Sequence, residues 1–354
     1  MTHAQDTTAT RKPMSNPLVL ACLATLACAL WGSAIPVIRF GYKQLEIASA
    51  DTGSQLLFAG IRFFLAGLAV TLVHAAASPD ARRLPDRGEL FAALQLSVFQ
   101  TFGQYLFNYI GYAHASGVSS SLLQGLSVFI ALLISSVIFR MEHLTARKVA
   151  GCVIGFAGIV VSTGGAGSTH FSFIGEGMVL ISLVMASMST VLMARKSQRF
   201  NPVLLCGWQF MIGGLGLVAV ALALGGRVDF VGHPTGLLQL GWLVMVSAVA
   251  YGVWSLLLRD NDVSRVAVFE FEIPVFGVLI SLLLLGAEGA TVGWGTVAAL
   301  VLVTIGILMV ESSPKAGAVA EAETTGASDA EVAPAVDGAV AEAGAEPAYS
   351  RNSA

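Results

Sequence analysis

The sequence predicts an all-α membrane protein with ten transmembrane helices, arranged as two inverted five-helix repeats. The first observation is composition: 55% of the 354 residues are hydrophobic and 12% are charged, with a mean hydropathy of +0.77. These values lie well outside the range of soluble globular chains. The second is a series of long apolar runs, and the third is a set of short segments that recur at one fixed offset.

The apolar runs have the length that a helix needs to cross hydrocarbon, about 17 to 25 residues. The ten runs lie at 17–38, 54–77, 91–112, 118–139, 146–163, 173–194, 203–224, 236–258, 265–286 and 293–311. The first is too long for the core of a cleaved signal peptide, so we expect it in the mature protein. All four cysteines fall inside runs, which argues against a disulfide framework or a metal site.

Basic residues predict the orientation of the runs. With the N-terminus in the cytoplasm, 15 of the 19 Lys and Arg residues are cytoplasmic. Arg39, Lys43 and Arg227 fall on the outer side of the membrane, and Arg62 falls within a span. Cytoplasmic loops carry the excess of Lys and Arg, so the sequence predicts a multi-pass protein of the cytoplasmic membrane with both termini inside.

Self-comparison predicts a duplication. RFFLAG at 62–67 aligns with QFMIGG at 209–214 at an offset of 147, and SVF at 127–129 aligns with PVF at 274–276 at the same offset. Thr145 and Thr291 precede matching spans and are predicted N-caps. Because each copy holds an odd number of spans, the second enters the membrane from the opposite side, as in many secondary transporters.

These observations divide the chain into five segments. They are an N-terminal cytoplasmic tail (1–16), a first repeat (17–163), a connecting loop (164–172), a second repeat (173–311) and an acidic, Ala-rich cytoplasmic tail (312–354). The last segment is too polar and too simple in composition to bury a core, so we expect it to be disordered.

Several short motifs resemble those of one family. They are WGS at 31–33, RFFLAG at 62–67, MEHLT around Glu142, and IPVFGVLIS with GAEGAT between 273 and 291. In order and spacing the chain resembles the EamA-type, ten-helix members of the drug/metabolite transporter superfamily. The resemblance implies a bundle with a central cavity that moves small metabolites, with amino acid export as the best substrate class, by alternating access. Ser127 departs from it, because many relatives have proline there, whereas Pro274 keeps the pattern.

The ninth span contains an unusual stretch, VFEFEIPVFGVLIS, between 268 and 281. Pro274 lacks an N–H and crowds the carbonyl of Glu270, which predicts a helix break that faces the protein interior or water. Glu272 lies about 200° around an ideal helix from Glu270, so the two carboxylates are not expected to share a site.

Arg62, Glu270 and Glu272 are the candidate intramembrane charges, and such groups are functional hypotheses by default. One interpretation is that a glutamate of the ninth span takes up and releases a proton and so couples transport to the proton gradient. Two others are a permanent pair between Arg62 and a glutamate, and carboxylates that reach the nearby membrane interface.

Polar and aromatic side chains in four other spans are the candidate substrate contacts. They are Gln104, Asn108, Gln124, Ser127, Gln209, Tyr251 and Trp254. Gln104 and Asn108 share one face of the third span, flanked by Tyr105 and Tyr109, and the repeat aligns Gln104 with Tyr251. Packing between helices is the competing interpretation for each amide and hydroxyl.

Other function classes have weaker support. The six histidines are scattered, and no HExxH or GxSxG motif is present. An intramembrane enzyme, a channel and a sensor remain the alternatives to a transporter. We expect no cofactor, no metal and no nucleic acid. The expected partners are a small-molecule substrate and membrane lipid, with protons as a candidate; the oligomeric state, the direction of transport and the coupling ion stay open.

Overall fold

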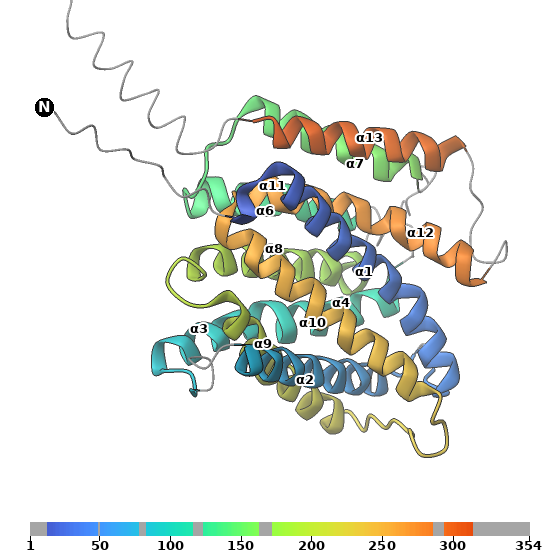
Figure 1. Ribbon diagram of the computed structural model, residues 1–354. Coiled ribbons are helices and arrows are strands. Elements are labelled where there is room, and N and C mark those ends of the chain that lie inside the picture. Colours follow the sequence, from blue (N-terminus) through green and yellow to red (C-terminus); the bar gives the residue numbers. More distant parts are fainter. Residues whose placement is uncertain are drawn as a thin grey trace, which may run out of the picture. The chain divides into compact units, whose positions relative to one another are not determined.

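The computed structural model describes residues 13–48, 50–77, 83–115, 123–162, 172–285 and 294–313. These all belong to one compact unit, Met1–Lys315. Within the described residues the regular elements are all helical, as predicted (Figure 1). The predicted connecting loop falls outside them except for Ser172, and so does the C-terminal tail beyond Ser313.

The α-helices are α1 (Pro17–Gln44), α2 (Thr52–Ala77), α3 (Arg87–Ser97), α4 (Tyr105–His114), α6 (Leu126–Leu133), α7 (Ala146–Ser162), α8 (Met178–Lys196), α9 (Pro202–Ala223), α10 (Gly236–Asp260), α11 (Val263–Ala267), α12 (Glu272–Leu285) and α13 (Trp294–Glu311). Shorter 3₁₀ or π segments are η1 (Pro13–Ser15), η3 (Val98–Gln104), η4 (Ile134–Ile138), η5 (Phe173–Gly177) and η6 (Val268–Phe271). Segment η3 joins α3 to α4, and η6 joins α11 to α12.

Five helices of the described part are long and apolar enough to cross a membrane. They are Pro17–Gln44, Thr52–Ala77, Phe173–Lys196, Pro202–Ala223 and Gly236–Asp260. Leu126–Ile138 and Leu300–Val310 are shorter apolar helices. The chain therefore has the helices of a multi-pass membrane protein.

Side-chain caps define where several helices begin. Asn16 and Asn201 each accept a hydrogen bond from the backbone N–H two residues further on, and a proline follows each of them at the first helical position. The Oγ1 atom of Thr145 accepts from the backbone N–H of Lys148 at 3.3 Å, which confirms the predicted cap of α7. The matching Thr291 lies outside the described residues.

Helix α1 is longer than its predicted span. It continues past residue 38 through Gln44, so that Arg39 and Lys43, which were expected in a loop, lie in its last turns. No proline occurs between residues 39 and 44, one glycine (Gly41) is tolerated, and polar side chains do not interrupt a helix. The chain leaves the helical conformation at Glu46, which has a φ of 54°.

The start of α3 carries a reciprocal cap. Asp86 Oδ1 accepts from the Glu89 N–H and Glu89 Oε2 accepts from the Asp86 N–H, both at 2.8 Å. Arg83 binds both Glu89 oxygens, at 2.6 and 2.7 Å. The bond from Arg83, followed by the Asp86 N–H, lowers the pKa of Glu89 below its ordinary value despite burial.

We expect Asp86→Ala to lower the free energy of unfolding by about 0.5 to 2 kcal/mol, because an N–H at the start of α3 loses its acceptor. The contribution of Glu89 is present above its ordinary pKa and is lost as pH falls through its lowered pKa. Thermal unfolding in detergent, at neutral and at acidic pH, measures both effects. Asp86→Asn keeps an acceptor and serves as the control; equal stability of the alanine and asparagine variants would contradict the cap.

The helices pack in pairs. Helix α2 lies against α9, and α7 lies against α13 (Figure 1). Helix α1, near the N-terminus, packs against α10 and α12, whereas α8, in the second half of the chain, packs against α4 and α6. Each half therefore contributes a helix that packs mainly among helices of the other half.

Helices α2 and α9 cross through glycines. A Cβ on Gly60 would lie 2.9 Å from the carbonyl oxygen of Gly214, and a Cβ on Gly67 would lie 2.5 Å from that of Gly207. The pairing runs in opposite directions along the two helices, so α2 and α9 are antiparallel. Small residues at such positions let two backbones approach closely, which is the usual basis of helix packing in membranes.

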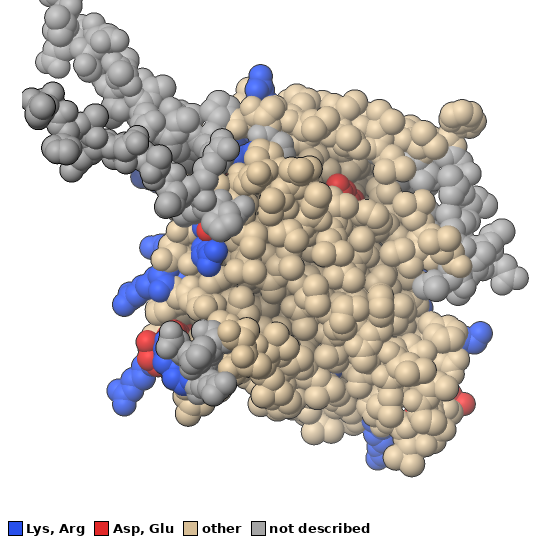
Figure 2. Space-filling model, viewed as in Figure 1, with Lys and Arg blue, Asp and Glu red and all other residues tan. Residues whose placement is uncertain are grey.

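Charged residues gather at the ends of the helices. Figure 2 shows Lys and Arg concentrated at the left of the view, where α1 and α7 begin and α8 ends, with fewer at the opposite end. A broad band of uncharged surface, interrupted by a small acidic patch, lies between the two ends (Figure 2). This distribution fits a protein whose middle zone contacts hydrocarbon.

Candidate functional site

Aromatic rings from both halves of the chain meet inside the bundle. We call Trp31, Phe63, Tyr105, Phe210, Tyr251 and Trp254 the aromatic cluster. Tyr251 packs edge-on against Trp31 at 4.8 Å and against Phe210 at 5.0 Å between ring centroids. Its hydroxyl lies 3.0 Å from that of Tyr105. Because α1, α2, α4, α9 and α10 all supply rings, any relative movement of these helices changes this cluster.

Arg62 lies beside the aromatic cluster, in the middle of α2, with 3% of its surface exposed. Its Nε donates to Ser247 Oγ at 2.8 Å, and its Cζ lies 5.0 Å from the centroid of the Phe63 ring. Among the ion pairs of the described residues, none includes Arg62. The guanidinium is therefore a buried cation without a carboxylate partner, which costs about 2.5 to 3.5 kcal/mol on insertion scales.

A hydrogen-bonded group of four side chains adjoins these rings. We call Gln100, Thr101, Ser189 and Gln209 the glutamine network. Thr101 Oγ1 donates to Gln209 Oε1 at 2.7 Å, and Gln209 Nε2 and Ser189 Oγ both donate to Gln100 Oε1, at 3.3 and 3.1 Å. The Gln100 side chain also lies close to that of Tyr251. The network joins η3, α8 and α9, and it adjoins the aromatic cluster at Tyr251 on α10.

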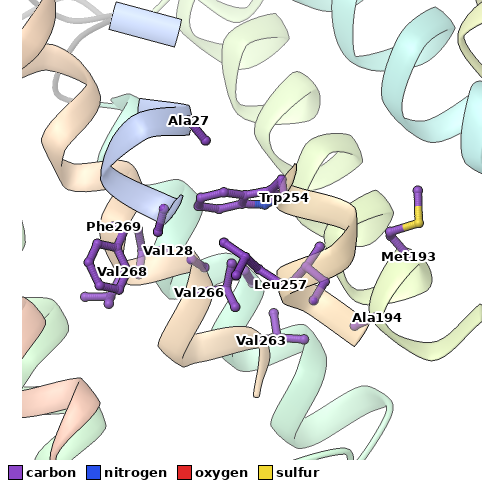
Figure 3. Packing of buried hydrophobic residues seen from close by; sticks show 14 of the residues in the cluster. Ala27, Val128, Met193, Ala194, Trp254, Leu257, Val263, Val266, Val268 and Phe269 are labelled. Carbon is purple, nitrogen blue, oxygen red and sulfur yellow. The ribbon is translucent and has the colours of Figure 1, made fainter. Parts of the chain in front are cut away.

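The predicted contact residues fall into three places. Gln209 belongs to the glutamine network and Tyr251 to the aromatic cluster, so the structure brings these two together. Trp254 packs on Trp31 at 4.9 Å between ring centroids and is 4% exposed. Figure 3 shows Trp254 among Ala27, Val128 and Leu257, in the hydrophobic core.

A second place is the end of α4. The Tyr112 hydroxyl accepts a hydrogen bond from Gln124 Nε2 and lies close to the Asn108 side chain. Asn108 and Gln124 are therefore both neighbours of the same tyrosine. Gln104, at the end of the π segment η3, is half-buried and makes no hydrogen bond with another described side chain.

The third place joins α6 to the segment before α12. Ser127 is buried, and its Oγ donates to Glu270 Oε2 at 2.8 Å. Its carbonyl oxygen accepts from Ser187 Oγ at 3.0 Å, which brings in α8. Glu270 thus pairs with a serine and not with Arg62, so the structure does not contain the Arg62–glutamate pair that was one sequence-based interpretation.

Glu272 contacts a different helix. Its side chain lies close to Thr25 on α1, and its Oε2 atom is buried without a partner among the described residues. Pro274 falls in the first turn of α12, where a missing N–H leaves no helical bond unmade. The irregular backbone lies upstream, in the 3₁₀ segment Val268–Phe271 that contains Glu270.

A buried ion pair lies near the end of the bundle where α7 begins. Lys148 Nζ lies 2.5 Å from Glu142 Oε2, and each side chain is 1% exposed. Ser135 Oγ and Ser264 Oγ donate to the same carboxylate, and the Ser264 N–H donates to it at 3.1 Å. Lys148 was counted among the basic residues on the cytoplasmic side; it lies in the first turn of α7 and is buried, because Glu142 and α11 enclose it.

The sequence did not single out two residues of this region. One is Ser247, the partner of Arg62, and a single serine in an apolar span is common. The other is Tyr42, whose hydroxyl donates to that of Tyr109 at 3.1 Å. Among the described residues, no group of three or more His, Cys, Asp or Glu side chains could hold a metal ion.

The sequence profile of the EamA-like transporter family matches the chain twice, at residues 18–164 and 173–312. The chain belongs to the EamA-like transporter family. The family resemblance predicted from the motifs is thereby confirmed. Together with the apolar helices, membership identifies a multi-pass membrane protein of transporter type.

Curated relatives of this EamA-like protein carry transporter names. An "Uncharacterized transporter" of Archaeoglobus fulgidus is 28% identical over 84% of this chain and 99% of the relative. A "Probable amino-acid metabolite efflux pump" of Escherichia coli is 26% identical over 74% of this chain and 86% of the relative. A crystal structure that is 20% identical superimposes with a TM-score of 0.66, over 82% of this chain and 95% of that one, which indicates a shared fold.

Proposed function

We propose that this EamA-like protein is a secondary active transporter that exports small organic metabolites, amino acids among them, by alternating access. In this proposal ten spans form two inverted five-helix repeats in the cytoplasmic membrane, with both termini inside. The observation that carries the proposal is that polar and aromatic side chains of both halves meet in one buried cluster between the halves, where transporters of this plan bind substrate.

The pairing of helices supports the inverted repeat. Under the offset of 147 residues, Gly60 corresponds to Gly207 and Gly67 to Gly214. The contacts Gly60–Gly214 and Gly67–Gly207 therefore exchange when the two halves are exchanged. The antiparallel crossing of α2 and α9 is what opposite membrane entry of two equivalent spans requires.

Packing between other helices shows the same symmetry between the two halves. In the repeat, α1 corresponds to α8, α10 to α3 and α4, and α12 to α6. Helix α1 packs on α10 and α12, and α8 packs on α4 and α6. The two family-profile matches cover the same two halves. Rocking of one repeat against the other would open the aromatic cluster to each side in turn.

Reconstitution of the purified full chain in vesicles tests the transporter class. We expect saturable counterflow of an amino acid such as L-leucine or L-phenylalanine, above that of protein-free vesicles. A membrane enzyme or sensor would give no counterflow with any solute in a broad panel. A channel would give flux that does not saturate at millimolar solute.

Proton coupling through Glu270 is the sharpest prediction of this proposal. Glu270→Gln should abolish transport driven by a pH gradient, because the amide cannot carry a proton through the cycle, and it should leave solute counterflow intact. The Ser127 hydroxyl still has an acceptor in the variant, so local packing is kept. Both activities are measured in the same vesicle preparation.

Glu46→Gln is the matched control, since Glu46 is exposed and lies outside the helices. Both activities should stay at the wild-type level in that variant. Retention of gradient-driven transport by Glu270→Gln would exclude Glu270 as the coupling group. The same test on Glu272→Gln then decides whether the second carboxylate of this stretch carries the proton.

A further inference from the structure

We infer that Arg62 is the binding point for the carboxylate of the substrate, so that the transported solutes are organic acids or amino acids with an apolar or aromatic body. This inference rests on the proposed transport function and adds the substrate class. It assigns a role to a buried charge that forms no ion pair with any residue of the described ranges.

Arg62 leaves most of its N–H donors unused among the described residues. A guanidinium has five N–H groups, and its Nε–H is taken by Ser247. The remaining four, on the two terminal nitrogens, donate to no other described residue. The bond to Ser247 and the Phe63 ring hold the group in one orientation. Arg62 is thus a fixed planar donor fork of the kind that binds carboxylates through two parallel bonds.

A further unused donor lies close by. Trp31 Nε1 is buried and finds no acceptor within the described part of the chain. The Trp31 ring packs on Tyr251, and Tyr251 follows Ser247 by one turn on the same face of α10. The N–H groups of Arg62 and Trp31 that lie near this turn of α10 therefore lack acceptors, and a ligand with several acceptor oxygens would supply them.

The charge of Arg62 is unusual for its position in the chain. Arg62 is the only Lys or Arg in the interior of a predicted span. The Ser247 hydroxyl and the Phe63 ring that it contacts are uncharged and do not compensate its charge. One guanidinium matches one carboxylate, whereas phosphate esters carry more charge and call for more cations. The surrounding rings then favour an apolar or aromatic body on the ligand.

The test compares ligands that share a phenyl body: two carry a carboxylate, with or without an amine, and two carry an amine without a carboxylate. Binding of L-phenylalanine, L-phenylalaninamide, 3-phenylpropionate and 2-phenylethylamine to the purified full chain is measured by calorimetry and by thermal shift. We expect both acids to bind on the order of 10-fold or more tightly than the amide and the amine, as a lost charge-assisted bond implies. This comparison uses the wild-type protein, so it does not depend on the folding of any variant.

Variants locate the effect. Arg62→Gln should remove the difference between acid and amide, whereas Arg62→Lys should keep a weaker preference for the acid, because the charge remains and the fork is lost. Arg195→Gln is the matched control: Arg195 also lies over a phenylalanine ring, Phe139, at 5.5 Å, but outside the cluster. It should bind all four compounds as the wild type does.

Three results would overturn the inference: neither acid binds, the amide binds as well as the acid, or Arg62→Gln keeps the acid preference. The proposed transport function is judged separately, by counterflow over the broad solute panel. Counterflow of amines or sugars without binding of acids would reject the carboxylate site and leave the transporter proposal standing. No counterflow with any solute would reject the transporter proposal.

Discussion

We expect Lys148→Met to destabilise the folded protein by about 3 to 5 kcal/mol, the cost of leaving one member of a buried ion pair without its partner. Glu142 is held by Lys148, by Ser135 and Ser264 hydroxyls and by the Ser264 N–H. The three neutral donors remain in the variant, but a negative charge enclosed by protein is left uncompensated. The midpoint of chemical or thermal unfolding in detergent measures the loss.

Arg147→Met is the control for this prediction, because Arg147 is the preceding residue, is exposed, and reaches only the carbonyl of Ser312. Its effect should stay within about 0.5 kcal/mol. The double variant Glu142→Gln/Lys148→Met should recover much of the stability, since it removes both charges together. Equal stability of the Lys148 and Arg147 variants would show that charge compensation at this pair does not stabilise the fold.

The pair also has a structural consequence for the bundle. Glu142 and Lys148 lie at the connection between α6 and α7, whereas Ser264 lies on α11, which leads into the 3₁₀ segment that carries Glu270. The carboxylate therefore joins the two halves of the chain at one end. Loss of this contact should loosen the segment next to Glu270 as well as lower the stability.

Gly67→Ala is expected to cost about 1 to 3 kcal/mol or more, the range for overpacking of a close contact. The added Cβ would lie 2.5 Å from the carbonyl oxygen of Gly207 and 2.7 Å from the backbone nitrogen of Met211. Both are backbone atoms, so the crossing of α2 and α9 must widen. Elution of a fluorescent fusion on size exclusion, followed by thermal unfolding, measures the loss of folded protein.

Two further alanine variants complete this test. Gly214→Ala, the repeat-related change, should behave like Gly67→Ala, since its Cβ would lie 2.6 Å from the backbone nitrogen of Phe64. Gly241→Ala on α10 meets nothing within 4 Å and should be neutral or mildly stabilising, because alanine favours helix. A Gly67→Ala variant as stable as Gly241→Ala would mean that the two helices do not cross there.

The candidate site was only partly predictable from the sequence. Gln209, Tyr251, Ser127 and Glu270 were candidates, since polar and ionisable groups in apolar spans are conspicuous. Their partners were not, because a hydrogen bond such as that from Ser127 to Glu270 joins residues 143 positions apart in the chain. No local pattern carries information about which helix faces which.

Trp254 shows that residue type alone does not predict the contacts of a side chain. Its type and its place in a span made it a candidate for stacking on a ligand. In the structure it packs with Trp31 and with the hydrophobic core around Leu257 (Figure 3). Aromatic side chains suit either role, so residue type alone does not show which neighbours the ring contacts.

The sequence by itself determined the helical membrane class, the places of the apolar helices and the family, because hydropathy, length and short motifs are properties of neighbouring residues. Only the tertiary structure decided that Arg62 bonds to Ser247 without a carboxylate, and that Lys148 is buried with Glu142 rather than exposed. Those outcomes depend on which helices cross and at which residues. Close crossings such as Gly67 on Gly207 set that geometry through backbone contact between distant segments.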